Sequence, residues 1–437
     1  MRYLFFLFII LQASISLAQT DSIQTIRCDA DTIRSYSLLL PKNYQKQQKY
    51  PVIFLFDPAA RGKMVVGLYR KAATEYGFIL IASNNSRNGP MGESLNAATA
   101  MFTDAFKKYS IDERQVYLAG FSGGARVATT IGLQSGGITG IIACSAGFSE
   151  PIPKAKLPWT LAAIAGNQDF NYVELQQVVQ TLQSSGSVSA LQMFAGPHRW
   201  PPVDVFMSAL LWSLLQHQKQ SNEDKIVQYR ALIDGLIGQN ISVATKANLY
   251  RQYLSIKQDA DYAEKLKALE TSAGYRDELA QEKQLMIKEN ACQQKIAEAF
   301  QQIITANTTA IKTKGWWKNE LASLNKMLLS HLPADSNYVA RQKAFIIANA
   351  AESFGNYYSA KRYDTAAELL TVSEVFEPEN PLVYYRHALL VAADKDESGT
   401  LYYLKQAISH NFSKQPLRTE PAFGFLRDNK KFQSLVY

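Results

Sequence analysis

The chain has 437 residues, of which 47% are apolar, and its formal net charge is +8. This length suggests two or three domains, and the apolar content suits a globular protein with a large core. Basic and acidic residues are interleaved, with no basic run and no basic–aromatic alternation, so the composition predicts no nucleic-acid partner. The 3 cysteines are scattered without metal-ligand spacing, and we predict no metal, no cofactor and no disulfide framework.

The N-terminus has the pattern of a secretory signal peptide. A positive start at Arg2 is followed by an apolar run from Leu4 to Leu11 and by small residues at Ser16 and Ala18. This order predicts a signal peptide over residues 1–18 and an exported protein, periplasmic or secreted. A transmembrane anchor is the alternative, but the apolar run is too short and no later segment has the pattern of a membrane span.

Apolar strand patterns alternate with helical periodicity through the first half of the chain. This alternation predicts an α/β fold, a mostly parallel sheet with helices on both faces. The predicted strands are 34–40, which we expect at the sheet edge, 52–56, 77–82, 115–118, 137–144, 159–165 and 190–194. The predicted helices are 63–76, 93–109, 125–131, 172–184 and 203–217.

A Gly-x-Ser-x-Gly pattern lies between a predicted strand and a predicted helix, at Gly120 to Gly124 with Ser122 in the middle. This is the setting of a nucleophile elbow, a tight turn that holds the serine in a strained conformation and needs glycines where a Cβ would clash. The helix start can offer N–H groups to a developing oxyanion. An ordinary Gly-rich turn also matches the pattern. A nucleophile elbow additionally requires an acid and a base further along the chain, and their presence distinguishes the two interpretations.

Asp169 and His198 follow two later predicted strands, in that order. Ligands bind at the carboxyl ends of parallel strands, so we expect both residues beside Ser122. His198 would then act as base and acid, and Asp169 would hold its tautomer. A loop histidine and a turn-forming aspartate are the structural alternatives. Glu150, in a Pro-rich loop, competes for the role of the acid, whereas Glu174 is expected to face away.

Residues from about Thr32 to His217 resemble an α/β-hydrolase domain. More narrowly, they are similar to the polyhydroxybutyrate-depolymerase, feruloyl-esterase and acetyl-xylan-esterase-like group. That group combines the serine elbow with an aspartate after a Gly-containing strand end and a Gly-rich His-x-Trp-Pro segment, matched here by Asp169 and by Gly196 to Pro201. The resemblance implies a Ser122–His198–Asp169 triad that forms an acyl-enzyme.

The chain departs from this group after its third strand. The group usually has His-Gly there, followed by a backbone N–H of the oxyanion hole, whereas this chain has Asp57-Pro58. Pro58 has no N–H. We therefore assign the oxyanion hole to the N–H groups of Gly123 and Ala59. Either Asp57 points away and caps the loop, or its carboxylate weakens the hole.

Three residues are predicted to contact substrate: Trp200, Phe121 and Asn85. Trp200 is either a wall of the acyl pocket or an anchor that pins the histidine loop. Asn84, Asn85 and Arg87 follow another strand end, and a polar turn is the alternative to a role in binding.

After residue 218 the strand pattern stops and helical periodicity continues to the end. We predict a helical region over 219–335 and helical repeats over 336–437. The repeats resemble a short tetratricopeptide array, which implies a possible protein partner, and a plain helical bundle is the alternative. The matching positions are Tyr363, Ala366, Leu370 and Pro378, then Ala388, Leu404 and Ala407, with Glu420 to Val436 as a cap.

Together these patterns predict an exported serine hydrolase with its α/β-hydrolase domain over 19–218. Its substrate would be a carboxylic ester, either a small molecule or an ester carried on a polysaccharide. The alternatives are a catalytically weak or dead hydrolase platform in an interaction protein, and a serine peptidase.

Overall fold

The computed structural model describes residues 22–217, 222–305 and 314–437. The predicted signal peptide lies outside these residues. The described chain divides into two compact units that meet at residues Ala280 and Gln281. No helix in the described ranges is long and apolar enough to cross a membrane.

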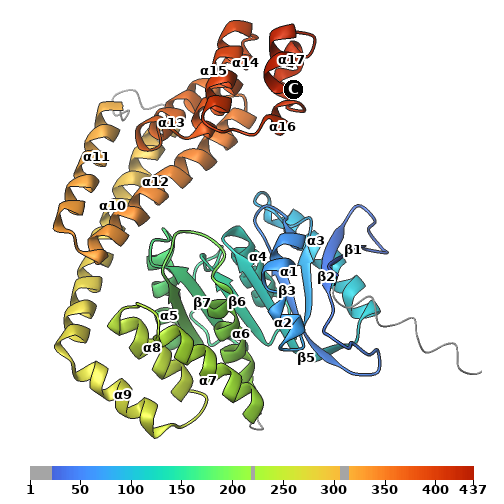
Figure 1. Cartoon of the computed structure of the whole chain (residues 1–437), viewed down its shortest axis with the longest axis vertical. Coiled ribbons are helices and arrows are strands. Elements are labelled where there is room, and N and C mark those ends of the chain that lie inside the picture. Colours follow the sequence, from blue (N-terminus) through green and yellow to red (C-terminus); the bar gives the residue numbers. More distant parts are fainter. Residues whose placement is uncertain (1–21, 218–221, 306–313) are drawn as a thin grey trace, which may run out of the picture. The chain divides into compact units, whose positions relative to one another are not determined.

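The first unit is built around one 8-stranded sheet with the order β1-β2-β4-β3-β5-β6-β7-β8 (Figure 1). The strands from β4 to β8 run parallel, and β1 and β2 are antiparallel additions at one side. Every predicted strand is present, but the first lies second in the sheet, because the unpredicted β1 covers its outer side. The strands are β1 Gln24–Arg27, β2 Ser35–Leu39, β3 Tyr50–Phe56, β4 Ile79–Ser83, β5 Ile111–Phe121, β6 Gly140–Cys144, β7 Thr160–Gly166 and β8 Ser189–Phe194.

Two hydrophobic cores lie on opposite faces of this sheet. Successive side chains of a strand point to opposite faces, and in β3 Ile53 and Leu55 join one core while Phe54 and Phe56 join the other. Helices α1 and α6 cover the first face, and α3, α4 and α5 cover the second. Their bounds are α1 Gly62–Leu68, α3 Met91–Lys108, α4 Gly123–Gln134, α5 Tyr172–Ser184 and α6 Val203–His217.

The helix predicted over 63–76 is broken in two. α1 ends at Leu68, and α2 covers only Lys71–Thr74. Tyr69, at the break, is fully buried, and its hydroxyl donates to the carbonyl of Pro201. A tertiary contact therefore overrides the continuous helical periodicity.

The first unit extends beyond the composition change at residue 218, which itself lies outside the described residues. Helices α7 Glu223–Ile237, α8 Val243–Leu254 and α9 Ala260–Thr271 contribute buried side chains to the same core as α6. Gln252 of α8 donates to the carbonyl of Leu191 in β8, the last strand of the sheet. An edge strand leaves backbone groups unpaired, and α8 satisfies one of them here. The expected boundary at 218 thus divides a continuous core.

The second unit is helical, as the periodicity predicts. α10 enters it from the first unit, and α12 packs against α13 and α14 against α15. Its elements are α10 Ala273–Ile304, α11 Lys314–Met327, η1 Leu328–Ser330, α12 Pro333–Ser359, α13 Tyr363–Phe376, α14 Pro381–Ala393, α15 Glu397–Ser409, α16 Lys414–Leu417, η2 Pro421–Leu426 and α17 Lys430–Val436.

The strand order, the parallel core of the sheet and the helices on both faces define the α/β-hydrolase fold for the first unit. The complete chain combines this fold with a C-terminal helical region.

We predict that a chain ending at His217 is unstable, whereas one ending at Ala280 folds. The shorter chain uncovers β8 and the apolar face of α6, which helices α7 to α9 bury in the intact protein. It should aggregate, or melt well below the longer chain, in thermal denaturation followed by circular dichroism. Equal melting temperatures for the two chains would show that these helices are dispensable.

Candidate active site

The nucleophile elbow predicted from the sequence is present at the junction of β5 and α4. Ser122 has φ 53° and ψ −123°, a conformation in the sparsely populated positive-φ region. A Cβ on Gly120 would lie 2.1 Å from the carbonyl oxygen of Gly124, and one on Gly124 would lie 2.0 Å from that of Phe56. Both flanking positions therefore require glycine, because α4 starts in direct contact with the strand ends.

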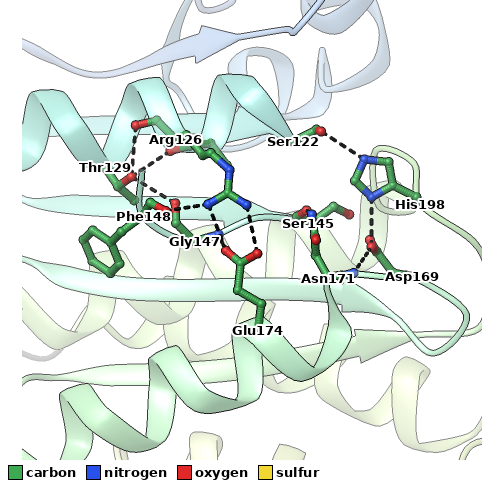
Figure 2. A network of polar contacts seen from close by, with 11 residues as sticks. Ser122, Arg126, Thr129, Ser145, Gly147, Phe148, Asp169, Asn171, Glu174 and His198 are labelled. Atoms are coloured by element: carbon green, nitrogen blue, oxygen red, sulfur yellow. Dashed lines mark hydrogen bonds and ion pairs between the residues drawn. The ribbon is translucent and has the colours of Figure 1, made fainter. Parts of the chain in front are cut away.

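The structure brings Ser122, His198 and Asp169 together in one hydrogen-bonded line (Figure 2). Nε2 of His198 lies 3.0 Å from Oγ of Ser122, and Nδ1 lies 2.8 Å from Oδ1 of Asp169. Asp169 is completely buried, and the His198 side chain retains 18% of its exposure. An imidazole that donates its Nδ1–H to a carboxylate leaves Nε2 as an acceptor, directed here at the serine hydroxyl.

Backbone contacts keep the acid and base loops in register. The carbonyl of Gly196, before His198, accepts from the N–H of Gln168, before Asp169. A Cβ on Gly166 would lie 2.2 Å from the same carbonyl oxygen, so the close approach of the loops requires glycine there. Asp169 Oδ1 also accepts from the N–H of Asn171, which fixes the carboxylate that faces His198.

Two aromatic rings hold the imidazole of His198. The ring of Phe170 is stacked on it at a centroid distance of 4.2 Å, and that of Phe121 lies at 4.7 Å. Sequence reasoning missed Phe170, and its position next to the predicted acid was the available signal. Phe121, predicted to contact substrate, is buried between His198 and Trp200 and supports the base instead.

The competing carboxylates are not at His198. Glu174 of α5 forms a two-point ion pair with Arg126 of α4 and accepts from the N–H of Gly147, as Figure 2 shows. This network ties α4 to α5 and to the loop after β6. Glu150 is exposed. Asp169 is the carboxylate hydrogen-bonded to the histidine.

Asp57 lies where the similar group usually has the His-Gly pattern, and its side chain is buried. It forms a clamp, by which we mean the hydrogen bonds of its carboxylate to two loops. Its carboxylate accepts from the indole N–H of Trp200 at 2.8 Å and from the guanidinium of Arg61 at 2.8 and 2.9 Å. Burial by itself would raise the pKa of Asp57, but these bonds and the one from Ala59 outweigh burial and leave the pKa below its ordinary value. Asp57 therefore joins the loop after β3 to the loop that carries His198.

The clamp corrects the predicted role of Ala59. Its N–H donates to Asp57 Oδ1 at 2.9 Å, and the N–H of Ala60 donates to the carbonyl of Asp57 at 3.0 Å. The N–H of Arg61 also bonds Asp57 Oδ1, at 3.3 Å. The loop thus turns its N–H groups onto Asp57 and away from an oxyanion. Gly123 keeps its place at the first turn of α4, where helix N–H groups lack intrahelical acceptors.

The other two predicted substrate contacts are also corrected. Trp200 is 8% exposed and its N–H is bound by Asp57, so it is the anchor of the histidine loop. Asn85 accepts from the N–H of Ser35 at 2.8 Å, and Asn84 exchanges hydrogen bonds with Ser35 and Ser37. Both asparagines therefore attach the loop after β4 to β2. Among the described residues no group of His, Cys, Asp and Glu is arranged to hold a metal ion.

No family model matches the chain, and no curated protein matches it. The similar solved structures include an S-formylglutathione hydrolase, FrmB, from Staphylococcus aureus, 15% identical over 44% of this chain and 96% of that one, with a TM-score of 0.38. A ferulic acid esterase is 20% identical over 43% of this chain and 94% of its own, with a TM-score of 0.35. An acylaminoacyl peptidase from Pyrococcus horikoshii is 13% identical over 47% of this chain but only 44% of its own, with a TM-score of 0.36. Identities this low concern the fold alone.

We predict that Asp169→Asn lowers turnover of an ester at least about a hundredfold, because an amide in this position can hold the imidazole in the wrong tautomer. Glu150→Gln, which changes an exposed carboxylate in the same way, serves as the matched control and should leave turnover near that of the wild type. Steady-state kinetics of both variants check this. A large loss in the control alone would reassign the acid.

We predict that Asp57→Asn lowers both stability and turnover. The amide cannot accept from Arg61, Trp200 and Ala59 together, and the loss of hydrogen bonds to a charged group costs about 1.5–3 kcal/mol each. Because folding lowers the pKa of Asp57, its stabilisation is complete above the ordinary aspartate pKa of about 3.9 and is lost in more acidic solution.

The difference in unfolding free energy between wild type and Asp57→Asn should therefore be constant near neutral pH and shrink in acid. Urea denaturation at several pH values measures it. Trp200→Phe removes one donor only and should give a smaller loss. If Asp57→Asn matches the wild type at neutral pH, the carboxylate does not hold these loops.

Proposed function

We propose that the chain is a serine hydrolase that cleaves carboxylic esters through an acyl-enzyme. The observation that carries the proposal is the continuous line from Ser122 to His198 to Asp169, at 3.0 and 2.8 Å, on a strained elbow. A serine hydroxyl is a poor nucleophile until a base removes its proton, and Nε2 of His198 lies within reach to do so.

The reaction follows from these positions. Ser122 Oγ attacks the ester carbonyl as its proton moves to His198 Nε2, and the N–H of Gly123 stabilises the oxyanion. His198 then returns the proton to the leaving alkoxide as the carbon–oxygen bond breaks. A water, deprotonated by the same nitrogen, then attacks the acyl carbon. The bond from this carbon to Ser122 Oγ breaks, His198 returns the proton to Oγ, and the acid is released. Asp169 stabilises the imidazolium in both steps.

Export of the protein is part of this proposal and rests on the N-terminal pattern of residues 1–18. An ester outside the cytoplasm, free or on a polysaccharide, is the substrate class that follows. The helical unit would serve as a tetratricopeptide-like partner site. The burial of Ala366, Leu370, Ala388, Leu404 and Ala407 within paired helices supports the repeat packing on which that role depends.

A specific observation favours a second candidate function. Since the N–H groups of Ala59, Ala60 and Arg61 are bound by Asp57, a hydrolase that relied on this loop would have a weak oxyanion hole. The domain would then be a platform that presents the helical unit to a partner.

Labelling with a fluorophosphonate separates the two candidates, because only an activated serine reacts. The wild type should be labelled and should hydrolyse a short-chain nitrophenyl ester. Ser122→Ala should lose both properties and keep its melting temperature, since the substitution removes one hydroxyl. An unlabelled wild type would favour the platform, and unchanged turnover in Ser122→Ala would place the nucleophile elsewhere.

A further inference from the structure

The proposed oxyanion site has one backbone donor, the N–H of Gly123, and the loop after β4 lies against the loop that follows β3. In the loop after β4 the N–H of Asn88 donates to the carbonyl of Pro58 at 2.8 Å, and Arg87 forms a β-bridge with Ala59. The loop therefore lies directly against the segment in which a second oxyanion donor was expected.

The side chain of Asn88 reaches the nucleophile elbow from this loop. A Cβ placed on Gly123 would lie 1.9 Å from Oδ1, 3.0 Å from Cγ and 3.7 Å from Nδ2 of Asn88. The amide thus rests on the backbone of the residue that follows Ser122. Asn88 is exposed, so a substrate can meet it from solvent.

The amide of Asn88 is also free to act. Among the described residues it has no hydrogen-bond partner, in contrast to Asn84 and Asn85 of the same loop. The terminal torsion of an asparagine has a broad, two-fold profile, so a half-turn exchanges Oδ1 and Nδ2 next to Gly123. The rotated side chain then presents an N–H group beside Gly123, the residue whose own N–H is proposed to bind the oxyanion.

We propose that Asn88 is a catalytic residue whose side-chain amide donates the second hydrogen bond to the oxyanion, in place of the backbone N–H groups that Asp57 binds. This inference rests on the proposed function and deepens it. No bond to Asn88 is made or broken. The amide donates a hydrogen bond to the negatively charged carbonyl oxygen while Ser122 Oγ is bonded to the carbon of a tetrahedral intermediate. This hydrogen bond weakens when the carbonyl re-forms.

The first test is Asn88→Ala, assayed with a nitrophenyl ester. Removal of one oxyanion donor lowers kcat by about a hundred- to a thousandfold. The expected loss is equal in kcat and kcat/KM, because the bond forms only in the transition state. Asn88→Asp, which sets a carboxylate beside the oxyanion, should lose more. Asn96→Ala, which removes an exposed amide from α3, is the matched control and should keep wild-type kinetics.

A double-mutant cycle with Gly123→Ala tests the contact itself. The new Cβ would displace the Asn88 amide, so Gly123→Ala should lower kcat in the wild type. In the Asn88→Ala background the same change should have little further effect. If the two fold losses in kcat multiply in the double variant, the new Cβ acts on the substrate independently of Asn88. This result would overturn the assignment.

The remaining outcomes are separable. Normal turnover by the wild type together with normal kcat in a folded Asn88→Ala variant overturns the role of Asn88 and leaves the proposed function standing. No turnover and no fluorophosphonate labelling in the wild type overturns both. The melting temperature of Asn88→Ala should match that of the wild type, because the Asn88 side chain is exposed and has no hydrogen-bond partner among the described residues. A lower value for Asn88→Ala with unchanged kcat would indicate a structural role instead.

Discussion

The close approach of backbones at the carboxyl ends of β3 and β5 is the constraint from which the site follows. α4 begins so near these strand ends that Gly120 and Gly124 leave no room for a Cβ against Gly124 and Phe56. The chain can make this turn only by holding Ser122 at positive φ. The same turn raises Oγ above the sheet and sets the first N–H groups of a helix beside it. One packing constraint therefore sets both the conformation of Ser122 and the helix start that follows it.

Asp57 is the second organising feature, and its effects oppose one another. Burial of a carboxylate is unfavourable, and the bonds from Arg61, Trp200 and Ala59 overcome that penalty. They connect the loop after β3 to the histidine loop and so help to position His198. They also occupy the N–H groups of Ala59 and Arg61, so that these groups are not available to a proposed oxyanion. An asparagine side chain from the neighbouring loop is chemically suited to replace them, since an amide donates without carrying a charge that would compete with the oxyanion.

The helices after residue 222 have two different relations to the fold. α7, α8 and α9 share the core of the sheet, and α8 reaches the backbone of β8 with a side-chain amide. From α10 onward the buried residues belong to separate cores that are entirely helical. A change in composition thus marks the end of the strands, whereas the packed unit ends only where apolar faces stop meeting the sheet.

By itself the sequence determined the alternation of strands and helices, the strand–elbow–helix at Ser122 and the order of acid and base. These are local properties, set by side-chain periodicity and by the few residues that a tight turn admits. It also marked Asp57-Pro58 as a departure, and left open whether Asp57 caps the loop or weakens the oxyanion hole. The direction of each side chain was decided only by the tertiary structure. Trp200 and Asn85 have the chemistry of ligand contacts, but Asp57 and Ser35 bind them. The side chain of Asn88, three positions after Asn85, has no such partner within the described part of the chain. Whether a polar side chain can contact a ligand depends on whether a group from a distant part of the chain already forms a hydrogen bond with it. Residues far apart in the chain become neighbours only through packing.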